Sequence, residues 1–202
     1  MRALLKRAKA DDQLEKFKSK LKQGDVLLSV PHKRDLVRRA AVETPQGTQF
    51  AHATIYDGGG QIIEISRTRG AHKKQLDTFL EENHAVAMRP QVSQREKNEA
   101  IERARSLVGS PYSISRGAKS ILGFESEADE DNIEEVAQNQ GVICSSVAGY
   151  AYKDMNFQKS PLNVLPKDIL QHPKFKRIGQ SFEPDNKPSY QQDLTSMGVS
   201  LK

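Results

Sequence analysis

The sequence holds one cysteine, no tryptophan and no long apolar run. A single cysteine cannot form a disulfide bond within the chain, which fits a reducing compartment. No apolar stretch approaches the ~18 residues of a membrane-spanning helix, and the basic first residues lack the continuous apolar segment of a secretory signal. We therefore expect a cytoplasmic protein by default, with export by another route or association with a virion as alternatives.

Several kinds of site that depend on a fixed motif are also missing. The sequence shows no basic face interleaved with aromatic residues, so we expect no nucleic-acid partner. No glycine-rich loop is followed by Lys-Ser or Lys-Thr, and Gly58-Gly59-Gly60 is typical of a turn. One cysteine and scattered histidines offer no metal-ligand spacing. We therefore predict neither a metal nor a cofactor.

The net charge of +5 is concentrated at the N-terminus. Residues 1–23 hold eight Lys/Arg and three Asp/Glu, and the rest of the chain holds 23 of each sign. Apolar residues recur there at spacings of three or four: Leu4, Leu5, Ala8, Leu14, Phe17 and Leu21. This pattern predicts a basic amphipathic helix over residues 2–22. Such a helix either packs on the domain or, through residues 1–22, makes a peripheral contact with an anionic membrane or a protein.

One domain is expected over residues 24–179. Strands are predicted at residues 26–30, 50–56, 61–65, 84–88 and 174–178. Asp57-Gly58-Gly59-Gly60 is a strong hairpin signal between the second and third of them. Helices are predicted over residues 73–82, over residues 93–108 behind a Ser93–Glu96 capping box, after Cys144 and after Pro166.

Two segments differ from this domain in composition. Residues 125–140 hold seven acidic and no basic residues, which is typical of a solvated insertion, although a lid near Cys144 is an alternative. Residues 180–202 are polar with two prolines, and we expect a tail that is ordered only by a partner. The oligomeric state is left unknown.

The one cysteine lies where a helix is expected to begin. Cys144 is preceded by an apolar pair and followed by two serines and a small, apolar stretch. The unpaired N–H groups and the macrodipole at a helix N-terminus favour a thiolate. A lone cysteine can equally be a small, buried hydrophobic residue, so a nucleophile needs further support from the chain.

Five histidines compete as the base that a thiol nucleophile requires. His52 lies inside a predicted strand just before a glycine turn, where a rigid sheet can hold it, and we favour it. The other four are His32 in a basic loop, His72 beside two lysines, His84 at the start of a strand and His172 before a proline.

A third group usually orients the base. His52 and Tyr56 share one face of their strand because side chains alternate with a period of two. Glu64 on the returning strand joins that face if even-numbered residues pair with even-numbered residues. The sequence leaves this register open, so Gln61 and Ser66 are alternatives.

Four motifs follow one another in a recognisable order. They are Gly24-Asp25-Val26-Leu27-Leu28, His52-Ala53-Thr54-Ile55-Tyr56 with the later Ile62-Ile63-Glu64, Gly109-Ser110-Pro111-Tyr112, and Ile143-Cys144-Ser145-Ser146 with Tyr150. Together with Leu165-Pro166-Lys167-Asp168-Ile169, they resemble the permuted NlpC-type papain-like cysteine hydrolases. That group includes the YaeF/YiiX-like permuted amidases and, more distantly, the lecithin:retinol acyltransferase relatives. The resemblance covers about residues 24–178.

The resemblance implies a fold and a set of roles. The fold is α+β and circularly permuted papain-like, with a small antiparallel sheet and flanking helices. Cys144 is the implied nucleophile, His52 the base and Glu64 the orienting residue, with the Cys144 backbone N–H in an oxyanion hole. The expected pocket residues are Tyr112, Ser145 and Tyr56.

The expected activity is that of a peptidase- or amidase-like cysteine hydrolase, which cleaves an amide or ester through an acyl-thioester. Peptides, cell-wall peptides and lipid-acyl compounds are consistent with the family, and a peptide amide is the first choice. The alternatives are an acyltransferase or lipid-directed hydrolase on the same fold, and a non-catalytic binding or assembly protein. Rapid alkylation of Cys144 at about pH 6 would favour an enzyme, because an ordinary thiol is almost wholly protonated there.

Overall fold

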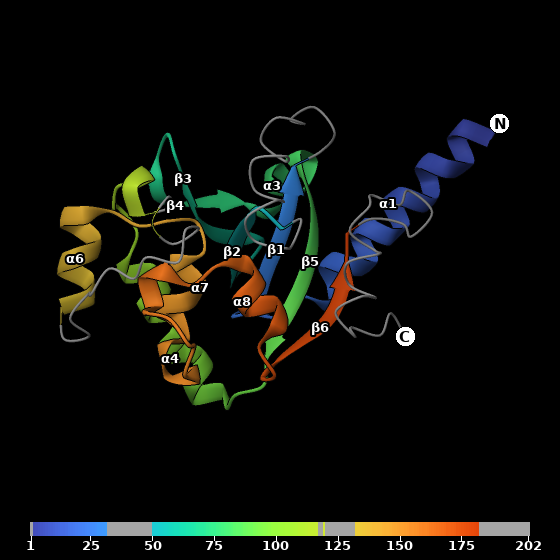
Figure 1. Ribbon diagram of the computed structural model, residues 1–202. Coiled ribbons are helices and arrows are strands. Elements are labelled where there is room, and N and C mark those ends of the chain that lie inside the picture. The colour runs from blue at the N-terminus through green and yellow to red at the C-terminus, as the bar shows by residue number, and fades with distance from the viewer. Residues whose placement is uncertain (1, 32–49, 117–118, 120–131, 182–202) are drawn as a thin grey trace.

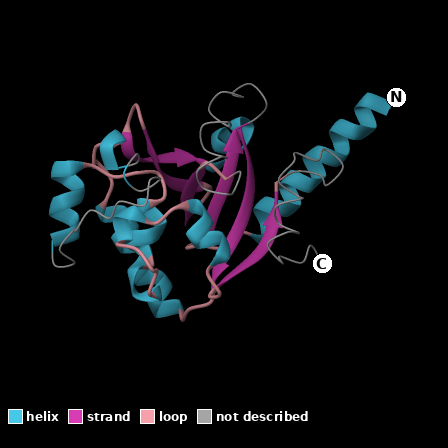
Figure 2. Cartoon of the chain, in the orientation of Figure 1, coloured by secondary structure: helices cyan, strands magenta, loops and turns pink. Residues whose placement is uncertain are grey.

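The computed structural model describes residues 2–31, 50–116, 119 and 132–181, which build an α+β fold around a six-stranded sheet (Figures 1 and 2). In sheet order the strands are β4 (Gly70–Gln75), β3 (Gln61–Ser66), β2 (His52–Gly58), β1 (Val26–Pro31), β5 (Asn83–Pro90) and β6 (Phe175–Gln180). Every neighbouring pair is antiparallel. The interior strand β1 is almost entirely apolar because side chains cover both of its faces.

Helices cover this sheet from two sides. They are α1 (Arg2–Lys20), α3 (Leu76–Glu82), α4 (Gln94–Ser106), α6 (Ile133–Gln140), α7 (Ser146–Ala151) and α8 (Pro166–Gln171), with short 3-10 turns η2 (Lys153–Met155) and η3 (Pro161–Asn163). In Figure 1, α4, α7 and α8 lie on one side of the sheet and α1 on the other. In the described part of the chain, no helix has both the length and the apolar character that crossing a membrane requires.

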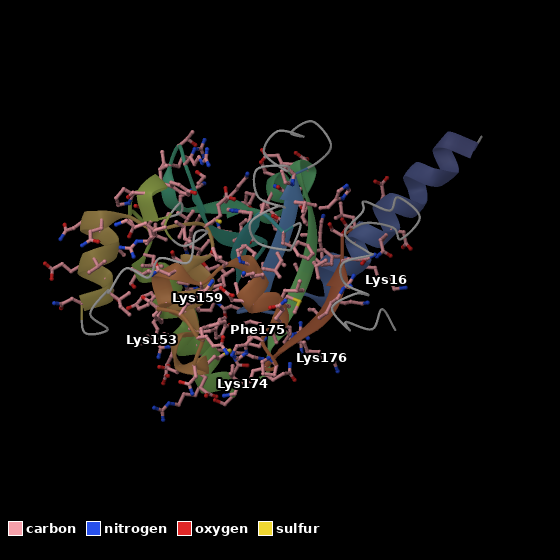
Figure 3. All side chains as sticks on the ribbon, viewed as in Figure 1. Lys16, Lys153, Lys159, Lys174, Phe175 and Lys176 are labelled. Carbon is pink, nitrogen blue, oxygen red and sulfur yellow. The ribbon has the colours of Figure 1, made fainter. Side chains whose placement is uncertain are left out.

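Two apolar clusters on opposite faces of the sheet hold these layers together. On one face, Ile55 and Ile63 pack with α4 and α7. On the other, Leu27 and Ile62 pack with Phe17 of α1 and Phe79 of α3. The described part of the predicted N-terminal helix therefore packs on the sheet through Phe17, while charged residues of α1 and β6 reach the surface, including Lys16 and Lys176 (Figure 3).

The β2–β3 hairpin has the register that the sequence left open. Tyr56 pairs with Ile62 and Ile55 with Ile63, so even-numbered residues lie opposite even-numbered residues. Gly58, Gly59 and Gly60 make the turn with φ values of 87°, 58° and 75°, a region that favours glycine. His52 and Glu64 consequently lie on the same face of the sheet.

The prediction of a helix over residues 73–82 is wrong in its first part. Residues 70–75 form β4, and the helix begins only at Leu76. The sequence Gly-Ala-His-Lys-Lys-Gln has little apolar alternation, so its extended form comes from pairing with β3 along its whole length. The capping box is confirmed: Ser93 caps α4, and Glu96 bonds back to the Ser93 backbone.

Some predictions fall on undescribed parts of the chain. His32 and its basic loop lie outside the described residues, as do residues 125–131 of the acidic segment and nearly all of the tail 180–202. The described end of the acidic segment is α6, whose Ile133 and Ala137 are buried in the core. This part of the segment therefore packs on the domain.

Candidate active site

Cys144 lies in a turn two residues before α7, and that turn is held by hydroxyl groups. Ser146 Oγ accepts a hydrogen bond from the Ile143 N–H at 3.0 Å and donates one to the Leu162 carbonyl at 2.7 Å. The hydroxyl of Ser145 donates to the Val164 carbonyl. Both serines are fully buried. The two serines that follow Cys144 thus fix the backbone of this turn through hydrogen bonds in the interior of the protein.

The sulfur of Cys144 reaches the start of β2. The Sγ atom lies 3.7 Å from the Ala51 carbonyl oxygen, and the Ala53 and Ser145 backbone N–H groups also bond to it. Burial raises the pKa of this thiol, but the hydrogen bond from His52 and its positive charge outweigh burial. The pKa of Cys144 therefore lies below its ordinary value, which favours a thiolate.

His52 lies between the sulfur and a carboxylate. Its Nε2 is 3.3 Å from Glu64 Oε2, and its ring also forms a hydrogen bond with the Cys144 side chain. Its ring also packs against Phe79 of α3, with ring centroids 6.2 Å apart. Burial lowers the pKa of His52, but Cys144 and Glu64 together raise it to about 9. The imidazole is consequently held as a cation between two anionic groups.

Glu64 is a buried carboxylate with several donors. Besides His52, its oxygens face His72 Nε2 at 3.2 Å and Lys74 Nζ at 3.5 Å. Burial raises the pKa of Glu64, but His52 and these two groups outweigh it and hold the pKa below its usual value. The carboxylate can therefore orient and stabilise the His52 imidazolium near neutral pH.

Sequence reasoning missed His72 and Lys74 as neighbours of this site. The two residues lie on β4, where His72 pairs directly with Glu64. The spacing of His72 and Lys74 could have indicated this, because side chains two residues apart on a strand lie on the same face of the sheet. The predicted helix over residues 73–82 includes Lys74 but not His72, and it hides the strand spacing that the two residues share.

The predicted pocket residues lie in different places. Tyr56 is near the opposite end of β2, where its hydroxyl accepts a bond from the Gly60 N–H at 3.2 Å. Tyr112 forms a short bridge with Val142, two residues before Cys144, and packs on the core. Ser145 directs its hydroxyl into the protein. The described contacts therefore connect Tyr112 and Ser145 to the backbone around Cys144 and place Tyr56 away from it.

The alternative site residues are also located. Gln61 begins β3 at the glycine turn, and the Ser66 hydroxyl accepts a bond from the Arg69 N–H at 3.3 Å. His172 contacts the Met155 carbonyl and the Phe157 ring. Glu64 is therefore the residue among the three orienting candidates that contacts His52.

Buried Arg116 supports the segment that leads to Cys144. Its Nε donates to the Gly141 carbonyl at 3.1 Å, and its Nη1 lies 3.3 Å from Asn163 Oδ1. Burial lowers the pKa of this guanidinium. Gly141 itself has a φ of 77°, and a Cβ there would lie 2.8 Å from the Pro111 carbonyl oxygen. The backbone before the thiol is thus fixed on both sides.

Comparison with solved structures identifies a relative in fold. The crystal structure of the metalloprotein yiiX from Escherichia coli O157:H7, assigned to DUF1105, superposes with a TM-score of 0.50 at 12% sequence identity. The alignment covers 80% of this chain and 98% of that one. The fold resembles that of YiiX. No protein-family model matches the sequence, and no curated protein matches it.

The likeness to YiiX concerns the fold and does not extend to a metal site among the described residues. YiiX is described as a metalloprotein. Among the residues that the structure of this chain describes, no group of three or more His, Cys, Asp or Glu side chains is arranged to hold a metal ion. The described residues thus offer no cluster of metal ligands.

Proposed function

We propose that this protein is a cysteine hydrolase of the permuted papain-like type, which cleaves an amide or ester through an acyl-thioester on Cys144. The observation that carries the proposal is the position of His52, which bonds to Cys144 on one side and to Glu64 on the other. The chain order His52, Glu64, Cys144 is the order of the permuted group and the reverse of ordinary papain-like proteins. YiiX supports the fold on which this proposal rests.

The side chains have separate tasks in this reaction. The Cys144 thiolate attacks the substrate carbonyl carbon, and the carbonyl oxygen becomes an oxyanion that the Cys144 backbone N–H can stabilise. The His52 imidazolium donates its proton to the departing amine or alcohol, which leaves an acyl-thioester. His52 then accepts a proton from water as the water attacks the thioester, and the acid product leaves with the thiolate restored. Glu64 keeps the imidazole ring oriented in both steps.

A peptide amide is the proposed substrate class, and residues 24–179 are the proposed catalytic unit. The substrate choice follows the papain-like arrangement of thiol and imidazole. Cell-wall peptides and lipid-acyl compounds share the same carbonyl chemistry, and transfer to an amine or alcohol would use the same acyl-thioester.

The decisive experiment is to trap the acyl-thioester. We expect the activated ester p-nitrophenyl acetate to acylate wild-type protein at Cys144, as detected by intact and peptide mass spectrometry, and Cys144→Ala to remain unmodified. Release of acetate to water would support a hydrolase, whereas transfer to added hydroxylamine in preference to water would support a transferase. Ser19→Ala, an exposed change on α1, is the matched control. Acylation of Cys144→Ala at the wild-type rate would overturn the proposal.

A further inference from the structure

We propose that His72 is a positioning residue of this site, which holds the Glu64 carboxylate in the orientation that binds His52. The inference rests on the proposed function and extends it to a second histidine. His72 lies directly opposite Glu64 in the β3–β4 register, and its Nε2 is 3.2 Å from Glu64 Oε1. His52 contacts the other oxygen, Oε2. The two oxygens of the Glu64 carboxylate therefore contact two different histidines.

His72 is itself fixed by the backbone. Its Nδ1 lies 3.0 Å from the Gly70 carbonyl oxygen. Both ring nitrogens of His72 therefore face oxygen atoms, Nδ1 the Gly70 carbonyl and Nε2 the Glu64 carboxylate. A histidine held at both nitrogens has little freedom to turn, which makes it a rigid support for the carboxylate.

The backbone beside His72 is in turn held by another segment of the same chain. The Ala71 N–H donates to the Ser110 carbonyl at 2.8 Å, and Gly70 has a φ of 65° and no room for a Cβ beside Ser110. The start of β4 is therefore tied to the segment after α4. A continuous set of contacts runs from Ser110 through the start of β4 and His72 to Glu64 and His52.

Lys74 is a less exclusive partner of Glu64. Its Nζ is 3.5 Å from Glu64 Oε1 but 2.7 Å from Glu82 Oε2 on α3. The exposed Glu82 competes for the ammonium group, and a lysine side chain has many rotamers. The groups that face Glu64 are thus His52 from β2 and His72 and Lys74 from β4, and of the β4 pair His72 is the one with a fixed geometry.

The test compares the pH profile of Cys144 alkylation by iodoacetamide in full-length variants. His72→Ala removes the support, so the rise of the alkylation rate should move to higher pH, with a loss of about threefold or more at about pH 6, which corresponds to half a pKa unit. His72→Gln keeps an N–H donor and should recover a large part of this loss. Gln75→Ala, an exposed change on the same strand, should leave the profile unchanged. Circular dichroism and urea unfolding establish that each variant is folded.

The possible outcomes separate the two proposals. A wild-type profile like that of an ordinary thiol would overturn the Cys144–His52 pair, and with it the role of His72. A wild-type profile at low pH that His72→Ala and His72→Gln both retain would overturn the role of His72 alone. If His72→Ala fails to fold, His72→Gln is compared with His72→Asn, whose shorter side chain cannot reach Glu64 in the same way. A wild-type profile in both of these folded variants would also overturn the role of His72.

Discussion

The hydroxyl of Tyr152 donates a 2.6 Å hydrogen bond to the carbonyl of Gly24, and it occupies the space that a side chain on Gly24 would need. A Cβ at Gly24 would lie 2.8 Å from that hydroxyl oxygen, and Gly24 has a φ of 91°. Next to it, the buried Asp25 carboxylate accepts two hydrogen bonds from Arg89. The Gly24-Asp25 pair therefore joins the helix α7 region to the sheet at the start of β1.

We expect Gly24→Ala to destabilise the fold by about 2 kcal/mol or more, because it adds backbone strain and a close contact. The free energy of unfolding in urea measures this. Gly59→Ala is the matched control: Gly59 also has a positive φ, but nothing lies within 4 Å of an added Cβ. Gly59→Ala should lower the free energy of unfolding by about 1 kcal/mol. Equal costs for the two variants would show that the Tyr152 contact contributes nothing.

The thiol of Cys144 should react rapidly at about pH 6, well below the pKa of a free thiol. The lowered pKa of Cys144 allows the thiolate to form at low pH, and the pKa of about 9 for His52 keeps the imidazolium until the pH rises through that value. In His52→Ala, only the Ala53 and Ser145 backbone N–H groups would still oppose burial, which raises the thiol pKa. Alkylation by iodoacetamide at about pH 6 should then slow at least tenfold, equivalent to one pKa unit. The control variant is His172→Gln, which changes a histidine that contacts Met155 and Phe157 instead, and it should keep the wild-type alkylation rate.

Glu64→Gln should cost about 2 kcal/mol of stability at neutral pH, because charge-assisted hydrogen bonds to a buried carboxylate are lost. The pKa of Glu64 is lower in the folded protein, so its contribution is present above its unfolded pKa and disappears as the pH falls through the folded value. Urea unfolding at neutral and acid pH should therefore show a difference from wild type that shrinks on acidification. Glu82→Gln, at an exposed ion pair, should change stability by less than about 1 kcal/mol. A pH-independent difference for Glu64→Gln would contradict the prediction.

Ser146→Ala should destabilise the protein by about 2 kcal/mol, because one hydroxyl satisfies both the Ile143 N–H and the Leu162 carbonyl in the interior. Thermal and urea unfolding measure the loss. Ser19→Ala removes an exposed hydroxyl that bonds to its own helix and should change stability by no more than about 0.5 kcal/mol. Wild-type stability in Ser146→Ala would show that the turn before α7 does not depend on this hydroxyl.

Local signals in the sequence predicted much of the fold. The apolar run of β1, the glycine turn between β2 and β3 and the Ser93–Glu96 cap each depend on residues close together in the chain. The hairpin register was left open because the turn glycines allow several loop lengths. The structure resolves it through the core, since Ile55 and Ile63 both face the α4 and α7 layer.

Long-range pairing explains what the sequence did not predict. The polar strand β4 is extended because β3 pairs with it, and this pairing is what brings His72 to Glu64. The Asp25–Arg89 ion pair joins residues 64 positions apart, and nothing near either residue indicates its partner. Residue type and motif order point to Cys144, His52 and Glu64, but the contact of His52 with Cys144 depends on how α7 docks against the sheet, and its contact with Glu64 depends on the hairpin register.

The contact between the Cys144 sulfur and the Ala51 carbonyl spans 93 positions of the chain, and it bears on when the Cys144 thiol acquires its lowered pKa. Closing so long a loop is a late event in folding compared with forming a hairpin. While the chain is being synthesised, Cys144 has no imidazolium beside it and behaves as an ordinary, largely protonated thiol. The lowered pKa of Cys144 therefore arises only once these two distant parts of the polypeptide have met.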